Sequence, residues 1–176
     1  MTASLPVLAP LPGARSDTVL CPSHPCILFG AAARQRDAEL RARVLPASSA
    51  LLYNEHVLQR ICILESHWLF GKPLCLVGWE WPVEPGWLHR GVGDLLFTDG
   101  FGHFVVVEVK SIVTGNRNRK RNRVEEQAHC YKAHVCELLE PFGASVEAYV
   151  FTDDRKAPGL RHPVRGAPVR TPPSMA

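Results

Sequence analysis

The sequence contains no apolar run that approaches the length needed to cross a membrane. Its first 20 residues lack the cationic stretch and the apolar core of a secretory signal, and Arg15 is their only basic residue. No internal repeat is visible. What is present is a chain of 176 residues, 46% hydrophobic and 21% charged, with a net charge of +3. This length and composition predict one soluble globular domain, or one domain with tails.

The six cysteines do not follow the pattern of a disulfide framework. Four of them lie among apolar neighbours inside expected helices or strands: Cys62, Cys75, Cys130 and Cys136. Such positions favour small buried side chains with free thiols. We therefore expect an intracellular, reducing compartment, and the nucleus or an organelle stays open if the source is eukaryotic.

The hydrophobic pattern predicts two helices and four strands. The first helix has an apolar stripe at helical spacing, formed by Leu51, Leu58, Ile61, Cys62, Trp68 and Leu69. In chain order we expect a helix over 48–70, strands over 73–81, 91–98 and 103–112, a helix over 124–140 and a strand over 145–152. Three strands can form an antiparallel meander, and a helical crossover then adds a parallel strand. The expected fold class is α/β, with a mixed four-stranded sheet in the order αβββαβ and helices on its faces.

These elements place the folded domain at residues 46–154. Residues 1–45 are expected to be an N-terminal extension that is partly disordered, since their first half is rich in Ala, Pro, Leu and Ser. Residues 155–176 carry Pro and Gly throughout with scattered Arg, which predicts a disordered basic tail.

Three charged residues stand in apolar company in the hairpin of residues 91–112. A three-residue turn at residues 100–102 would place Asp94 directly opposite Glu108, with Lys110 on the same face. A two-residue turn at Asp99 and Gly100 would instead turn Glu108 to the other face. We favour the three-residue turn because it gathers the charges, whereas the alternative buries single charges on both faces.

Two opposed carboxylates repel each other, and burial of each charge is costly unless it is compensated. Lys110 offsets one negative charge, and the remaining excess favours a cation. Two carboxylates with waters and a backbone carbonyl are the ligands that Mg²⁺ prefers. The alternative is an exposed sheet edge with a weak ion pair between Glu108 and Lys110.

The first strand of the hairpin carries the pattern Gly-x-Gly-Asp, which ends at Asp94, and the second strand carries Glu108-x-Lys110. This arrangement resembles the PD-(D/E)XK nuclease superfamily. The next helix carries Gln127 and Tyr131, which resemble the QxxxY motif of its RecB-like and λ-exonuclease-like branch. The resemblance implies a restriction-endonuclease-like core over residues 46–154 and a metal-dependent nuclease that hydrolyses phosphodiester bonds, with DNA as the favoured substrate and Mg²⁺ or Mn²⁺ as cofactor. Gly93 stands where the family name has Pro. No Cys follows Cys136, so the iron–sulfur cluster of some relatives is not supported.

The resemblance also assigns roles to individual residues. Asp94 and Glu108 would hold the metal, with the backbone carbonyl of Val109 as a third ligand. Lys110 would orient the attacking water or stabilise the charge of the transition state.

The helices supply the remaining candidates. Glu55 resembles the family's additional helix acid, and Glu65 is the alternative. Gln127 would hold active-site water or contact the phosphate. Tyr131 would hydrogen-bond the phosphate or pack against Lys110. For Gln127 and Tyr131 the alternatives are an exposed helix residue and a core aromatic.

A basic loop is expected between the third strand and the second helix. It contains Arg117, Arg119, Lys120, Arg121 and Arg123. Beside an active site it would bind a phosphate backbone, whereas a solvated loop and a nuclear-localisation signal are the alternatives. The expected partner is nucleic acid, with no membrane, and the oligomeric state cannot be read. A catalytically inactive nucleic-acid-binding module of the same fold is the alternative function.

Overall fold

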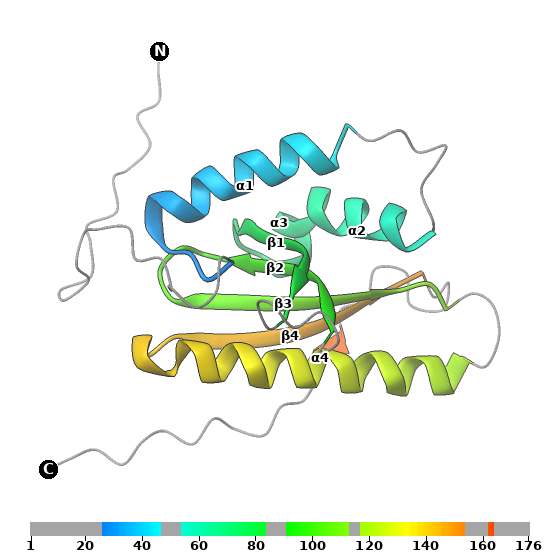
Figure 1. Cartoon of the computed structure of the whole chain (residues 1–176). Coiled ribbons are helices and arrows are strands. Elements are labelled where there is room, and N and C mark those ends of the chain that lie inside the picture. The colour runs from blue at the N-terminus through cyan, green and yellow to red at the C-terminus, as the bar shows by residue number, and fades with distance from the viewer. Residues whose placement is uncertain (1–25, 47–53, 84–90, 113–116, 154–161, 164–176) are drawn as a thin grey trace, which may run out of the picture.

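A mixed sheet forms the centre of the molecule, with helices on both of its faces (Figure 1). The computed structural model describes residues 26–46, 54–83, 91–112, 117–153 and 162–163. Within these residues no helix combines the length and the apolar composition that a membrane crossing requires. The α/β class predicted from the sequence is confirmed.

The four predicted strands lie in the predicted order. They are β1 (Cys75–Pro82), β2 (Val92–Thr98), β3 (His103–Lys110) and β4 (Ser145–Thr152). The pairs β1–β2 and β2–β3 are antiparallel, and β3–β4 is parallel. A two-residue strand, β5 (His162–Pro163), adds to the far side of β4. The Pro and Gly content of this segment predicts no strand there.

The hairpin between β2 and β3 has the three-residue turn. Leu95 pairs with Val107 and Thr98 with Phe104, and the backbone N–H of Asp99 donates to the carbonyl of His103. Gly100 and Gly102 both have positive φ, which a turn this tight requires and glycine readily adopts. In this register Asp94 stands opposite Glu108, as predicted.

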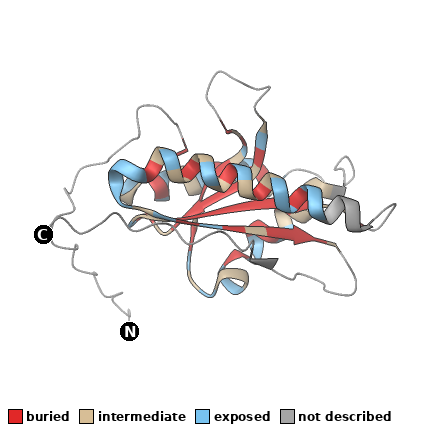
Figure 2. Ribbon diagram, turned by 90° about the horizontal axis from the view of Figure 1, so that it is seen from below, coloured by how far each residue is buried: buried red, intermediate tan, exposed pale blue. Residues whose placement is uncertain are grey.

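Helix α4 (Arg117–Leu139) connects β3 to β4 and covers one face of the sheet (Figure 1). Its buried positions recur every three or four residues, so one side faces the core and the other faces solvent (Figure 2). These positions are Val124, Ala128, Tyr131, Val135 and Leu139. The helix begins at Arg117, seven residues before the predicted start at 124. The basic segment expected as a loop therefore forms the first two turns of α4, which corrects the prediction.

Helices α2 (Asn54–Leu64) and α3 (Ser66–Phe70) lie on the other face of the sheet. They replace the single helix predicted over 48–70, although backbone hydrogen bonds still cross the junction at Glu65. The predicted apolar stripe is wrong at two positions, because Ile61 is 41% exposed and Trp68 is 77% exposed. Residues 47–53, which include Leu51 of that stripe, lie outside the described residues.

Helix α1 (Gly30–Val44) was not predicted, and it packs on β1 on the same side as α2 (Figure 1). Only Ala33, Leu40 and Val44 are buried among its 15 residues, and the remainder is largely Arg, Glu and Ala. A pattern of three buried side chains in four turns is too sparse to distinguish from a polar linker. Leu40 and Val44 nevertheless complete the core that α2 forms with the sheet.

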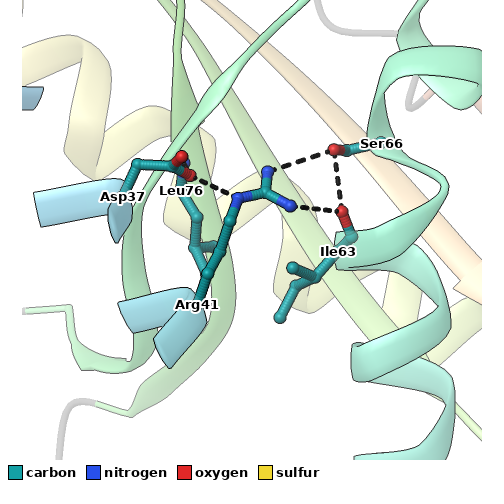
Figure 3. Close-up of polar contacts among 5 residues, drawn as sticks. All are labelled: Asp37, Arg41, Ile63, Ser66 and Leu76. Carbon is teal, nitrogen blue, oxygen red and sulfur yellow. Dashed lines mark hydrogen bonds and ion pairs between the residues drawn. The ribbon is translucent and has the colours of Figure 1, made fainter. Parts of the chain in front are cut away.

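A polar network ties α1 to β1 and to the end of α2 (Figure 3). Asp37 accepts hydrogen bonds from the backbone N–H of Leu76 and from Arg41 Nε. The Arg41 guanidinium then donates to the carbonyl of Ile63 and to Ser66 Oγ, and the Ser66 hydroxyl donates to the same carbonyl. These side chains satisfy the Ile63 carbonyl where the helix breaks between α2 and α3.

Candidate active site

The centre of the candidate site is the pair of opposed carboxyl groups. Glu108 is 5% exposed, and its side chain hydrogen-bonds that of Asp94. Burial is the main cause that raises the pKa of Glu108 to about 10, and the hydrogen bond and the charge of Asp94 act in the same direction. Lys110 lowers this pKa, but by less. Without a cation, burial and the neighbouring Asp94 therefore favour the protonated form of Glu108.

Asp94 marks the place where β2 and β3 part. Their pairing ends at Leu95 and Val107, and the backbone N–H of Val109 donates to Asp94 Oδ2 at 2.7 Å. The carboxylate thus takes the position that a backbone acceptor of β2 would hold in a continued ladder. Its other oxygen, Oδ1, accepts from Nε2 of Gln59 on α2 at 2.9 Å.

Lys110 lies at the same end of the sheet, where its ammonium group contacts α2. Lys110 Nζ is 2.7 Å from Glu55 Oε1, and both side chains are 39% exposed. Of the two helix acids considered, Glu55 contacts Lys110, whereas Glu65 is exposed at the junction of α2 and α3.

Tyr131 and Gln127 approach the pair from α4, on the opposite side of the sheet from α2. Tyr131 is buried, and burial raises its pKa, with smaller contributions in the same direction from Glu108 and Asp94. A hydrogen bond to Gln127 opposes that rise. The phenol therefore stays protonated and can donate a hydrogen bond near the carboxyl pair.

Two glycines leave room for the large side chains around Asp94. A Cβ added to Gly91 would lie 2.7 Å from Tyr131 Oη, and one added to Gly93 would lie 2.6 Å from the Trp81 ring. Trp81 is 1% exposed and packs edge-on against Tyr131 at 6.2 Å between ring centroids. The spacing Gly-x-Gly-Asp is thus explained by packing, because a side chain at Gly91 or Gly93 would meet Tyr131 or Trp81.

Among the five basic residues of this segment, only Arg123 has a described side chain. Arg123 is exposed and lies one helical turn before Gln127. Residues 117–121 form the start of α4, and their side chains lie outside the described part of the structure. The first turn of α4 contains no acidic residue, so nothing there offsets the positive end of the helix dipole. This end of the helix favours an anion.

The described residues contain no group of three or more His, Cys, Asp or Glu side chains that could hold a metal ion. The carboxyl pair nevertheless fits a cation, because two neighbouring acids, one buried and one half-buried, that share a hydrogen bond can exchange a proton for a positive ion. A metal would then be held by Asp94 and Glu108, with the carbonyl of Val109 as the predicted third ligand and water completing the set.

Sequence reasoning missed Gln59, which is 2% exposed and holds Asp94. Its Oε1 accepts from Trp79 Nε1 at 2.9 Å. A weak signal existed, because Gln59 is four residues after Glu55 and therefore shares its helix face. Its partners come from two other elements, so the sequence alone does not reveal the contact.

Comparisons of the chain with protein-family models, with curated proteins and with solved structures gave no match.

Proposed function

We propose that the protein is a metal-dependent nuclease with a restriction-endonuclease-like core, hydrolysing phosphodiester bonds with DNA as the expected substrate. The observation that carries this proposal is the pairing of the buried Glu108 with the half-buried Asp94 at the point where two central strands part. Lys110 follows on the same face, so a cation site and a fixed positive charge lie side by side.

The residues around the pair fit the needs of phosphodiester hydrolysis. A bound Mg²⁺ or Mn²⁺ would activate water and offset the charge that develops on the phosphoryl oxygens. Lys110 would donate to the attacking water or to a phosphoryl oxygen, and Glu55 holds its ammonium group in place. Tyr131 and Gln127 would donate hydrogen bonds to the phosphate from the α4 side.

The amino end of α4 supports nucleic acid as the substrate. Five basic residues, Arg117, Arg119, Lys120, Arg121 and Arg123, fall in its first two turns. Residues 119, 123, 127 and 131 recur every four positions, so they follow a line that winds slowly around the helix, from the exposed Arg123 to the buried Tyr131. A phosphate backbone that follows this line would lead from the basic end of α4 to the carboxyl pair.

The test is cleavage of linear duplex, circular duplex and single-stranded DNA, and of RNA, by the purified full chain with Mg²⁺, Mn²⁺ or EDTA. We expect metal-dependent cleavage that is lost in Asp94→Asn and Lys110→Ala, and retained in the control Glu65→Gln. Circular dichroism would verify that each variant is folded. Equal background cleavage by wild type and both site variants would overturn the proposal. Salt-dependent DNA binding without turnover would favour the inactive binding module.

A further inference from the structure

We propose that Gln59 and Trp79 are positioning residues that fix the Asp94 carboxylate for a divalent cation, so that cation affinity depends on the indole N–H of Trp79. This inference rests on the proposed function, since it assumes that Asp94 binds a cation. It assigns a role to two residues that touch neither the metal nor the substrate.

The orientation of the Gln59 amide follows from hydrogen-bond chemistry. An indole N–H is a donor only, so the atom of Gln59 that lies 2.9 Å from Trp79 Nε1 must be the amide oxygen. The amide nitrogen then faces Asp94 Oδ1 at 2.9 Å as a donor. The Trp79 indole thus decides which end of the amide meets the carboxylate.

The indole is itself held by residues from two helices. The Arg43 guanidinium of α1 lies over its ring at 5.0 Å from the centroid. The ring of His56 on α2 meets it at 6.5 Å with a steep interplanar angle of 64°. Trp79 belongs to β1, so its contacts with Arg43 and His56 join α1, α2 and the sheet at one point.

The consequence for Asp94 is a fixed carboxylate plane. Besides its hydrogen bond with Glu108, the carboxylate accepts one hydrogen bond at each oxygen, from Gln59 on one side and from the Val109 backbone on the other. A cation would take the place of the proton shared with Glu108. If the amide turned over, its oxygen would face the carboxylate and repel it, and only the Val109 bond would orient the group.

The Gln59 position does not require a polar side chain for packing. Gln59 is 2% exposed, and its α2 neighbours Cys62 and Ile63 are fully buried. Leu has a similar volume and would fill the same space. Polar partners of metal ligands commonly alter affinity when they are removed, by about 10–100-fold.

The experiment measures Mn²⁺ affinity of the full chain by titration calorimetry, in the absence of nucleic acid. Trp79→Phe keeps the ring but removes the N–H, and Gln59→Leu removes the amide. We expect each variant to bind Mn²⁺ about tenfold more weakly than wild type. The double variant should be no weaker than Gln59→Leu alone, because both changes break one chain of hydrogen bonds.

Trp68→Phe is the matched control, since it makes the same substitution at an indole that is 77% exposed on α3. Equal Mn²⁺ affinity in wild type, Trp79→Phe and Gln59→Leu would overturn the inference and leave the proposed function standing. Additive losses in the double variant, or a similar loss in Trp68→Phe, would also overturn it. Absence of Mn²⁺ binding by wild type itself would instead overturn the proposed function.

Discussion

At the scale of single residues, the unusual feature is a carboxyl group, that of Glu108, that is buried beside a second carboxyl group. The pKa of Glu108 is raised from its ordinary value of 4.5 to about 10. Between these two values the folded protein binds a proton that the unfolded chain has released, so stability falls as pH rises through this range. Below 4.5 the stabilising contribution is fully present.

Glu108→Gln should therefore flatten this pH dependence in the metal-free protein. Gln imitates the protonated acid and keeps a donor for Asp94. We expect wild type to lose stability relative to the variant from pH 5 to pH 9 in EDTA, measured by urea unfolding at several pH values. Parallel pH profiles for the two proteins would contradict the burial-driven shift.

Gly91 is a second position where one residue governs the site. Its φ is +108°, and an added Cβ would meet Tyr131 Oη at 2.7 Å. Gly91→Ala should cost about 1–3 kcal/mol in the free energy of unfolding, as strain and a displaced Tyr131 combine. Denaturant unfolding measures this cost.

Gly71→Ala is the matched control, because Gly71 also has a positive φ, +67°, but open space around its Cβ position. It should lose less stability than Gly91→Ala. Tyr131→Phe, which removes the nearest clashing atom, should recover part of the loss at Gly91. Equal losses at the two glycines would show that the contact with Tyr131 does not matter.

At the scale of elements, the hairpin was predictable and the helix ends were not. Register between β2 and β3 follows from a local turn, so the opposition of Asp94 and Glu108 could be derived on paper. The start of α4 could not be, because basic residues oppose the helix dipole and favour a loop. Gln59 was missed since its contacts to Trp79 and Asp94 arise only when α2, β1 and β2 have packed together.

The basic first turns of α4 predict a steep salt dependence of nucleic-acid binding. If all five basic residues contact phosphates of duplex DNA, log affinity should fall with log salt with a slope of about −4 to −5. Arg123→Ala should make the slope shallower by about 1. Fluorescence anisotropy with the Asp94→Asn protein in EDTA would measure it without cleavage.

Arg34→Ala is a suitable control, because Arg34 is exposed on α1, which lies across the sheet from α4 (Figure 1). When Arg34→Ala is added to Asp94→Asn, the slope of log affinity against log salt should equal that of Asp94→Asn alone. An unchanged slope in Arg123→Ala would indicate that nucleic acid does not follow α4.

The Asp37–Arg41 network gives a stability prediction for α1. Arg41→Met removes hydrogen bonds to Asp37 and Ile63 and leaves the partly buried Asp37 carboxylate without its cation. We expect a loss of about 2–3 kcal/mol in the free energy of unfolding, measured with urea. Arg36→Met is the control: its ion pair with Glu39 is exposed and should contribute less than about 1 kcal/mol. If Arg41→Met and Arg36→Met lost similarly little free energy of unfolding, the Asp37–Arg41 network would not anchor α1.

At the scale of the whole molecule, the candidate site joins the two sides of the sheet. Glu55 and Gln59 come from α2, Tyr131 comes from α4, and they meet only where β2 and β3 part. Of this arrangement, the sequence pattern could predict the sheet and the α4 side. It could not predict the packing of α1 on β1, whose apolar positions are too few to form a clear stripe.

A site assembled from all these layers exists only in the folded chain, so a cation that binds it must stabilise the whole molecule. At free Mn²⁺ of 100 times its Kd, linkage predicts a gain of about 2.7 kcal/mol in the free energy of unfolding. Urea unfolding with Mn²⁺ and with EDTA measures the gain. Asp94→Asn should lose most of it, because one of two carboxylate ligands is gone, while Trp68→Phe keeps it in full. An equal gain in wild type and Asp94→Asn would place the stabilising ion away from Asp94 and Glu108.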